Sequence, residues 1–327
     1  MNILFNSVGR RAELLKCFKK SLQPESRIVA IDHSKYSPGL YFADQSVTVP
    51  LITDEGYIPE ILKICENEKI DAVTTLIDPE ILILSSNRKL FEQKGVLVLA
   101  PEEWTAQLCF DKFKMYEYLS EKGINTVRTW DNYKDTTSAI QSGIVKMPVF
   151  VKPRTGSGSV GARRISEIAE LEEAFKLDPS LIAQELMAGD DVVDLDADVY
   201  IDTITRKPVS IFSKRKISTT IGGANKTISF KDSKLFDFID EICDCFGFCG
   251  PIDMDFFYKN GEYYLSEVNP RFGGAYLHAY GAGVDFIKLI ENNVKGIENP
   301  RSIGDYQDDI VMMMYDSVVI KSLDELI

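Results

Sequence analysis

The first hundred residues alternate between short apolar runs and amphipathic stretches whose apolar positions recur every three or four residues. Short apolar runs predict strands, and the longer period predicts helices. Such alternation is typical of a doubly wound α/β layer built on a parallel sheet. The predicted strands are Ile3–Phe5, Arg27–Ile31, Ala72–Ile77 and Val96–Leu99, and the predicted helices are Arg11–Lys20, Tyr57–Glu68 and Glu80–Lys94.

Charged residues follow several of these predicted strands. They are Gly9-Arg10-Arg11, Asp32 and the run Ile77-Asp78-Pro79-Glu80. In an open parallel sheet, ligands bind beyond the carboxyl ends of the strands. These segments therefore have two readings of equal weight, a ligand-facing rim and ordinary solvated loops.

A second region begins near Pro101, with a predicted helix over Asp111–Lys122 that stops at Gly123. From Val149 onward the chain is rich in predicted strands, and after Pro300 one apolar run, Ile310–Met314, predicts a last strand. No internal repeat or low-complexity segment interrupts this order.

A glycine-rich loop follows one of these strands, in the stretch FVKPRTGSGSVGARRISE. Gly156, Gly158 and Gly161 have the spacing of a dinucleotide-binding turn, but in that fold the third glycine opens a helix. Here a short extended piece comes next, and only then Ser166 as a predicted N-cap of a helix over Glu167–Ala174.

The loop is therefore predicted to join two strands. Backbone N–H groups in a serine- and glycine-rich hairpin tip can surround a polyphosphate, and Lys152 supplies a positive charge beside it. A plain flexible loop is the alternative.

Oxygen ligands gather near the sequence SEVNPRFGG. Glu267 and Asn269 are two residues apart on a predicted strand and so share a face, and Asp255 can share it across a hairpin turn at Asn260-Gly261. Two carboxylates and an amide suit Mg2+ or Mn2+ bound largely through substrate phosphates. Arg271, just past the strand, can hold a phosphate or carboxylate.

The alternative for this group is surface charge on a hairpin. Val268, Phe256 and Leu265 are predicted to bury the other face of the two strands, which favours a polar face that points into a site.

Composition excludes several functional classes. There are 37 basic and 50 acidic residues, a formal charge of -13, which disfavours nucleic acid and anionic membrane partners. The apolar runs are far shorter than the roughly 20 residues of a membrane helix. The N-terminus MNILFNSVGRR has its arginines after the apolar run, the reverse of a secretory signal, so a cytoplasmic protein is expected.

Six cysteines show no disulfide framework and are expected to be reduced thiols. Cys243, Cys245 and Cys249 have a spacing that can bind metal, but the same residues fit the apolar positions of an amphipathic helix, which is the favoured reading.

Several motifs together resemble a known family. They are GRR after the first strand, IDPE at 77–80, DK at 111–112, VFVKPRTGSGSVG, AQEL at 183–186 and SEVNPRFGG, in this order. The chain resembles the ATP-grasp superfamily, most closely the branch similar to the carbamoyl-phosphate synthase large subunit, over residues 1 to about 290. This resemblance implies a mixed α/β and α+β protein, with a doubly wound pre-ATP-grasp domain followed by a two-part ATP-grasp fold.

The resemblance also implies boundaries. Residues 1–105 would form the pre-ATP-grasp α/β domain and residues 106–300 the ATP-grasp domain. The latter divides into a lid subdomain at about 112–183 and a metal-bearing subdomain at about 184–300. Residues 301–327 would form a C-terminal tail with a strand and a helix.

Site roles follow from the same resemblance. ATP would lie between the lid and the metal-bearing subdomain. The predicted phosphate-binding residues are Lys112, Lys152, Gly156, Ser157, Gly158 and Ser159, and the segment predicted to bind adenine is Gln184, Glu185 and Leu186. The predicted metal ligands are Asp255, Glu267 and Asn269. The cations predicted to stabilise the transferring phosphoryl group are Arg215, Arg271 and Lys152. The ribose-binding acid is either Asp191 or Asp194, with Asp191 preferred.

The implied reaction is that of an ATP-dependent carboxylate–amine ligase. A substrate carboxylate attacks the γ-phosphate, and an amine then attacks the acyl phosphate, while the glycine loop acts as a lid that excludes water. With only His33 and His278, histidine acid–base catalysis is scarcely available. His278 is as readily structural as substrate-facing.

Candidate substrate contacts lie in the first domain. They are Arg10, Arg11, Asp78 and Glu80, of which Asp78 and Glu80 would hold an ammonium group. The partners expected are a small-molecule carboxylate and amine, with a homodimer possible.

Two other functions compete with the ligase. An NAD-type oxidoreductase is suggested by the glycine pattern and by Asp32, which follows Gly9 by 23 residues, and a non-catalytic ATP-binding module would keep the fold without turnover.

Overall fold

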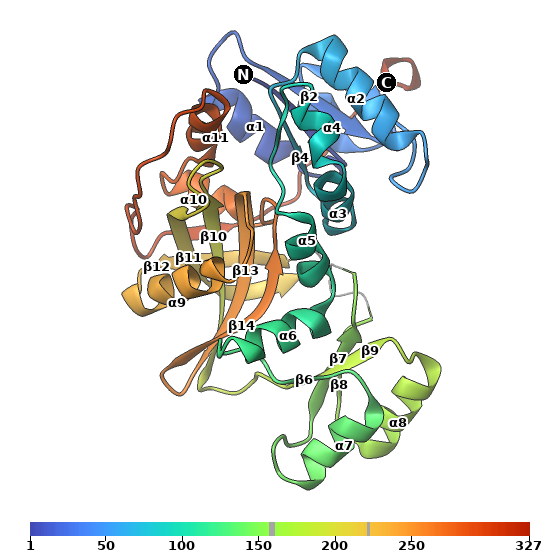
Figure 1. The fold of residues 1–327 in the computed structure, drawn as a ribbon, viewed down its shortest axis with the longest axis vertical. Helices are drawn as coiled ribbons and strands as arrows, with labels where there is room; N and C mark the ends of the chain where they lie inside the picture. The colour runs from blue at the N-terminus through green and yellow to red at the C-terminus, as the bar shows by residue number, and fades with distance from the viewer. Residues whose placement is uncertain (157–160, 221–222) are drawn as a thin grey trace.

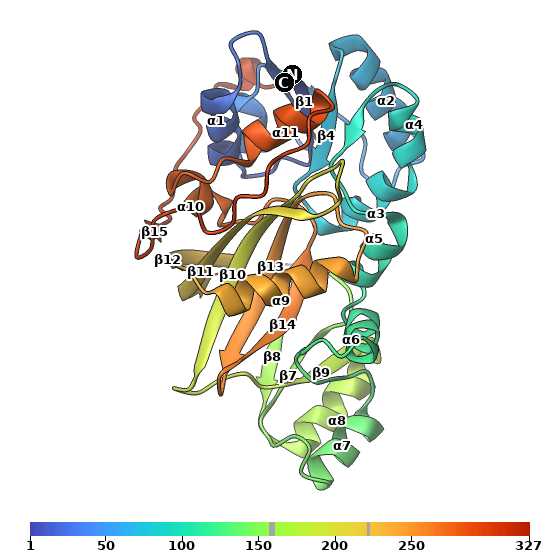
Figure 2. The same cartoon turned by 60° about the vertical axis from the view of Figure 1, so that its left-hand side comes forward.

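The structure is a computed structural model that describes residues 1–156, 161–220 and 223–327. Three sheets lie one after another along the long axis of the molecule (Figure 1). The N-terminal sheet lies at one end, a large antiparallel sheet occupies the middle, and a small subdomain forms the other end (Figures 1 and 2).

The N-terminal domain is a five-stranded, wholly parallel sheet in the order β3-β2-β1-β4-β5. Alternation along β1 sends Ile3 and Phe5 into one apolar core and Leu4 into another on the opposite face. The predicted doubly wound layer is therefore confirmed. Its elements are β1 (Asn2–Asn6), α1 (Ala12–Ser21), β2 (Arg27–Asp32), the 3-10 helix η1 (Pro38–Phe42), β3 (Gln45–Thr48), α2 (Tyr57–Glu68), β4 (Ala72–Thr75), α3 (Asp78–Ser86), α4 (Arg88–Glu92) and β5 (Leu97–Val98).

The prediction of one helix over Glu80–Lys94 is wrong. Helix α3 begins at Asp78, where Pro79 occupies the first turn without losing a needed hydrogen bond. It ends at Asn87, whose backbone leaves the helical region and whose side chain donates a hydrogen bond to the carbonyl of Ile83 at 2.9 Å. A second helix, α4, then starts at Arg88.

Two helices lead out of this domain into a small four-stranded antiparallel sheet with the order β6-β9-β7-β8. Strands β7 and β8 pair as an antiparallel hairpin, which confirms that the glycine-rich segment joins two strands. Helix α8 is capped at Glu167, one residue later than predicted. The elements are α5 (Glu103–Phe110), α6 (Lys112–Glu121), β6 (Thr129–Trp130), α7 (Tyr133–Gln141), β7 (Val149–Pro153), β8 (Arg163–Ile165), α8 (Ile168–Leu177) and β9 (Leu181–Glu185).

The large sheet is antiparallel, with the order β14-β13-β10-β11-β12-β15. Helix α9 covers one of its faces, and Figure 2 shows this helix lying across the strands. The hairpin at Asn260-Gly261 is confirmed, and both residues have positive φ, as a tight turn requires. The elements are β10 (Val192–Ile201), β11 (Pro208–Thr220), β12 (Gly223–Phe230), α9 (Ser233–Asp244), β13 (Gly250–Lys259), β14 (Glu262–Asn269), α10 (Tyr276–Gly281), α11 (Phe286–Val294) and β15 (Val311–Met313).

The structure also tests the predictions for the cysteine-containing helix and for the C-terminal tail. The helix reading of the three cysteines holds only for Cys243, which is buried on the inner face of amphipathic α9 beside Ile239 and Ile242. The helix ends at Asp244, so Cys245 is its C-cap and Cys249 lies beyond it, directly before β13. In the tail, β15 confirms the expected strand, while the expected helix is only a 3-10 turn, η2 (Leu323–Glu325). Within the described residues, no helix has the length and apolar character needed to cross a membrane.

One apolar core joins the N-terminal domain to the large sheet. It contains Phe5 and Phe18 from the first domain and Phe272, Tyr276 and Phe286 from the segments after β14. The ring of Phe272 lies 5.6 Å from that of Phe18 and 4.8 Å from that of Tyr276. The two parts therefore share their packing.

Replacing Phe272 should destabilise both parts at once. We expect Phe272→Ala to lower the free energy of unfolding by about 3–5 kcal/mol, because it leaves a cavity in a fully packed core. Denaturant unfolding followed by circular dichroism measures this change. The exposed Tyr36→Ala should stay within about 0.5 kcal/mol of the wild type, and an equally small effect of Phe272→Ala would contradict the shared core.

Candidate active site

Strand β10 has two chemically different faces. Leu195, Ala197 and Val199 pack into the apolar core under α9, so the alternating Asp194, Asp196 and Asp198 lie on the opposite face. Neighbouring strands add charged residues to that side of the sheet. We call this set the charged face: Asp194, Asp196 and Asp198 on β10, Lys214 and Lys216 on β11, Asp253 and Asp255 on β13, and Glu267 and Asn269 on β14.

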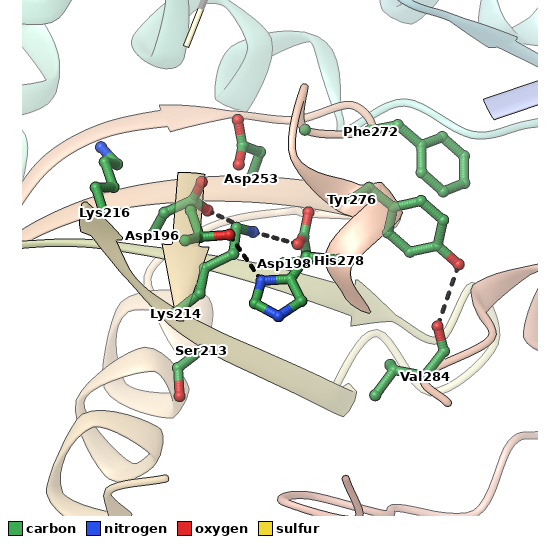
Figure 3. A network of polar contacts seen from close by, with 12 residues as sticks. Asp196, Asp198, Ser213, Lys214, Lys216, Asp253, Phe272, Tyr276, His278 and Val284 are labelled. Carbon is green, nitrogen blue, oxygen red and sulfur yellow. Dashed lines mark hydrogen bonds and ion pairs between the residues drawn. The ribbon is translucent and has the colours of Figure 1, made fainter. Parts of the chain in front are cut away.

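Lys214 lies at the buried centre of the charged face. Its ammonium nitrogen is 3.0 Å from an oxygen of Asp196 and also pairs with Asp198, and its side chain is wholly buried (Figure 3). Burial raises the pKa of Asp198 to about 6, although Lys214 opposes the change. Burial and the adjacent acids Asp196 and Asp255 also raise the pKa of Asp253 well above its ordinary value.

Two lysines from different elements converge on Glu267. The Lys112 nitrogen, from the start of α6, is 3.6 Å from one carboxylate oxygen, and the Lys152 nitrogen, from β7, is 3.8 Å from the other. Lys112 also donates to the carbonyl of Gly156 at 2.6 Å. Burial lowers the pKa of Lys152, with Glu267 opposing and Lys112 adding to this effect. Such a paired cationic site suits phosphate groups.

The candidate metal ligands lie on the paired strands β13 and β14. Asp255 is directly opposite Glu267, while Asn269 is opposite Asp253. A β-bulge lies between the pairs Asp255–Glu267 and Phe256–Leu265. The bulge lets Leu265 and Val268 both reach the core although they are three residues apart, and it turns Glu267 toward Asp255.

This donor set fits Mg2+ held partly by phosphate. Asp255, Glu267 and Asn269 offer only oxygen, which is what Mg2+ prefers, and Mg2+ commonly takes one or two protein carboxylates together with phosphates. Across residues 1–156, 161–220 and 223–327, no cluster of three His, Cys, Asp or Glu side chains is arranged to hold a metal by itself. The fit therefore depends on a phosphate-bearing ligand.

Arg271 is held between two domains. Its guanidinium makes a two-pronged contact with Asp78 of α3, at 2.9 and 3.2 Å, and donates to Asp253 of β13 at 3.1 Å. Arg11 lies beside it and donates to the carbonyl of Gly273 at 2.6 Å. Burial and the nearby Arg271 cation lower the pKa of Arg11 to about 10.

A small cleft lies beside some of these groups. It is lined by Asp78 and Ile81 of α3, by Cys109 of α5 and Lys112 of α6, and by Glu267 and Asn269 of β14. The N-terminal domain, the linking helices and the large sheet therefore all contribute to one site.

Three predicted site residues lie away from this cleft. Arg215 alternates with Lys214 and Lys216 along β11, so it faces the other side of the sheet, where it is half exposed and 3.9 Å from Asp309. Arg10 is exposed on the loop after β1. Glu80 is fully buried within the first domain, where its carboxylate accepts hydrogen bonds from Asn6, Ser7 and Thr75 at 2.7 Å each and from Tyr57.

The prediction that Glu80 binds a substrate ammonium group is wrong, because its buried carboxylate is already saturated by internal donors. Asp78 lines the cleft and is paired with Arg271, so its predicted role stays a prediction.

The predicted adenine segment lies at the junction of the small and large sheets. Gln184 is buried and donates to Thr129 at 2.9 Å, and Glu185 pairs with Lys259 of β13 at 3.4 Å. Leu186, directly after β9, is half-buried. Of the loop residues, Gly156 lies by Lys112, whereas Ser157, Gly158 and Ser159 lie outside the described residues.

The two ribose candidates differ in position. Asp191 is exposed in the turn before β10, while Asp194 lies on the charged face and is 3.0 Å from Lys216. Burial raises the pKa of Asp194, and Lys216 opposes this. Both remain candidates.

The sequence reading missed most of the charged face. It did not identify Lys214, Lys216, Asp196, Asp198 or Asp253 as site residues. Two sequence patterns indicate the first four of them. The run DLDAD places three acids on one face of a strand, and KRK places two lysines on one face of another. Antiparallel pairing of these strands brings opposite charges together.

His278 is structural in this fold. Its Nδ1 lies 2.7 Å from the Thr227 hydroxyl, its ring packs edge-on to Phe212 at 4.9 Å, and it is almost fully buried (Figure 3). Burial, and then the neighbouring Lys214 cation, lower the pKa of His278 to about 4.

Comparisons with known proteins identify two segments. Residues 3–99 match the family model described as a PylC-like N-terminal domain, and residues 109–275 match the one described as an ATP-grasp domain. The Bacillus subtilis arginine-specific carbamoyl phosphate synthase large chain is 22% identical over 70% of this chain, which covers 22% of that relative. The chain likewise spans 25% of the Bacillus subtilis pyruvate carboxylase.

Solved structures agree with this fold. N5-carboxyaminoimidazole synthetase from Staphylococcus aureus superposes with a TM-score of 0.71 at 19% identity, covering 92% of this chain and 78% of that one. The biotin carboxylase domain of 2-oxoglutarate carboxylase from Hydrogenobacter thermophilus, solved with MgADP and bicarbonate, has a TM-score of 0.74 at 15% identity, covering 95% and 73%.

Acidification should destabilise the protein through His278. Between pH 6.5 and about 4 the unfolded chain binds a proton on this ring and the folded chain does not, so stability falls as pH falls through that window. A tenfold change in proton affinity is about 1.4 kcal/mol, so the loss is up to about 3 kcal/mol.

Urea unfolding at pH 7 and pH 4.5 measures this loss. The His278→Gln variant should lose less stability between the two pH values than the wild type, whereas the exposed His33→Gln should behave like the wild type. An identical pH dependence in all three proteins would show that His278 has no such role.

Proposed function

The chain belongs to the ATP-grasp family, and we propose that it is an ATP-dependent carboxylate–amine ligase. It would join a small carboxylic acid, such as an amino acid, to an amine, forming a C–N bond and releasing ADP and phosphate. Mg2+ or Mn2+ would accompany ATP.

One observation carries this proposal. Lys112 and Lys152 reach Glu267 from two different elements, and Glu267 is itself opposite Asp255. Two cations and two carboxylates gathered around Glu267 can hold a metal-bound polyphosphate, because the lysines would bind phosphate oxygens while the carboxylates would bind the metal. Phosphoryl transfer depends mainly on this positioning and charge neutralisation.

The residues divide the work of the reaction. Lys112 and Lys152 would hold the ATP phosphates, and Asp255, Glu267 and Asn269 would hold Mg2+, which neutralises charge on the transferring group. Arg271, fixed by Asp78 and Asp253, would offer its remaining donor to the developing acyl phosphate. An amine then attacks the acyl carbon and phosphate leaves.

The nucleotide base and sugar would be read at the junction of the two sheets. Gln184, Glu185 and Leu186 would present backbone groups to adenine, and Asp191 or Asp194 would accept from the ribose hydroxyls.

Compartment and assembly are part of the proposal. The cysteines are unpaired, which suits a reducing cytoplasm. The proposal includes a homodimer, and nucleic acid and membrane partners are not expected from a chain of net charge -13.

Two other functions make different predictions. A non-catalytic ATP-binding module would bind nucleotide without turnover. An NAD-type oxidoreductase is disfavoured because β7 and β8 form an antiparallel hairpin, whereas a dinucleotide turn needs a strand followed by a helix.

Release of ADP tests the ligase directly. The purified protein is incubated with MgATP and pairs drawn from amino acids, other carboxylates and amines, and ADP is measured by a coupled assay. We expect release that requires both partners of a pair. Nucleotide binding without release for any pair would favour the binding module instead.

Lys152 should be essential to this turnover. We expect Lys152→Ala to lower kcat/KM for ATP at least about 100-fold, because a charge-assisted phosphate contact is lost at a buried position. Lys146→Ala removes an exposed lysine of the same subdomain and should be neutral. Near-normal kcat/KM in Lys152→Ala would refute the assignment.

Glu267 should set the metal requirement. Glu267→Gln keeps the shape and removes the charge, so the Mg2+ concentration for half-maximal ADP release should rise about tenfold or more. Glu262→Gln, on the same strand but exposed, is the matched control. An unchanged Mg2+ dependence in Glu267→Gln would exclude it as a metal ligand.

A further inference from the structure

Lys216 occupies a position that no motif assigned. Its ammonium nitrogen lies 3.0 Å from Asp194 and 2.5 Å from Asp255, so one cation bridges a ribose candidate and a metal candidate. The side chain is only 12% exposed, which keeps the bridge largely away from water.

Glu267, the other carboxylate predicted to bind the metal, also has cationic neighbours. Glu267 has Lys112 near one oxygen and Lys152 near the other. Both acidic candidates for the metal site thus have lysine partners. Mg2+ needs oxygens at about 2.0–2.1 Å, and an ammonium group bound to the same oxygen would repel it strongly at this depth.

We propose that Lys216 is a positioning residue that holds Asp255 until nucleotide arrives, so that a divalent cation binds this site only together with nucleotide phosphates. This rests on the proposed function as far as ATP and metal binding, but not on the identity of the acid and amine. On nucleotide binding, Lys112 and Lys152 would exchange Glu267 for phosphate oxygens, and Lys216 would release Asp255, which could then bind the cation.

Lys216 is suited to this exchange where Lys214 is not. Lys214 is wholly buried and paired with both Asp196 and Asp198, so releasing either acid would leave it buried without a partner. Lys216 has a second partner in Asp194, whose side chain is 40% exposed. It can release Asp255 and still keep one ion pair.

Mn2+ binding without turnover tests the idea. Free Mn2+ is measured by electron paramagnetic resonance during titration of the full chain, with and without ADP. The wild type should bind Mn2+ at least about tenfold more tightly when ADP is present, and by linkage ADP should bind more tightly by the same factor with Mn2+. Equal Mn2+ affinity with and without ADP would overturn the proposal.

Substitutions of Lys216 test whether this side chain itself weakens metal binding in the absence of nucleotide. Without ADP, Lys216→Met should bind Mn2+ at least about tenfold more tightly than the wild type, because a cation close to the ligand oxygens is removed. Lys216→Arg keeps the charge and should stay weak. Lys226→Met removes an exposed lysine from the adjacent strand β12 and should change nothing.

Three further outcomes would contradict the role of Lys216, the metal site or the proposed function, respectively. If Lys216→Met is folded by circular dichroism and its Mn2+ affinity equals that of the wild type, Lys216 does not hold the metal position. If no protein binds Mn2+ even with ADP while ADP itself binds, the proposed metal site fails and this inference with it. If ADP does not bind at all, the proposed function itself is wrong.

Discussion

A row of carboxylates on one face of a sheet, of which Asp196 and Asp198 are buried, is the constraint on which much of this structure depends. The apolar residues of strand β10 pack toward α9. Because side chains alternate along a strand, Asp194, Asp196 and Asp198 lie on the opposite side of the sheet. Buried carboxylates are costly unless they are paired. Lys214 and Lys216 on β11 supply part of that pairing, and Arg271 supplies more.

The same requirement explains why the first domain is integral to the site. Arg271 needs two acids, and one of them, Asp78, comes from the N-terminal sheet. Arg11, from the loop after β1, reaches the backbone of Gly273. Since the apolar core around Phe272 also crosses this boundary, the domain contributes both packing and charge to the cleft.

Much of this arrangement is readable from the chain. Periodicity predicts the parallel N-terminal layer, the β7–β8 hairpin and the turn at Asn260-Gly261, because each depends on local sequence. The face on which a residue lies depends on pairing register instead. Arg215 was therefore misplaced, although its neighbours Lys214 and Lys216 reach the charged face. The prediction for Glu80 failed because the sequence does not show that its carboxylate is buried. That burial depends on hydrogen-bond donors that the fold brings together, from Asn6, Ser7, Tyr57 and Thr75.

The small subdomain has an apolar core of its own. Val149, Leu171 and Ala183 belong to it, and among the described residues this core includes no side chain from the N-terminal domain or the large sheet. Its ties to the rest include polar ones, such as Arg154 with Asp111 and Glu185 with Lys259. Moving this piece would leave its own apolar core intact and would cost polar contacts instead, among them the backbone hydrogen bond from Lys112 to Arg154 and the ion pair of Lys152 with Glu267. Because Lys152 is largely buried, added salt screens that ion pair only weakly, so the ease of the motion should depend little on ionic strength.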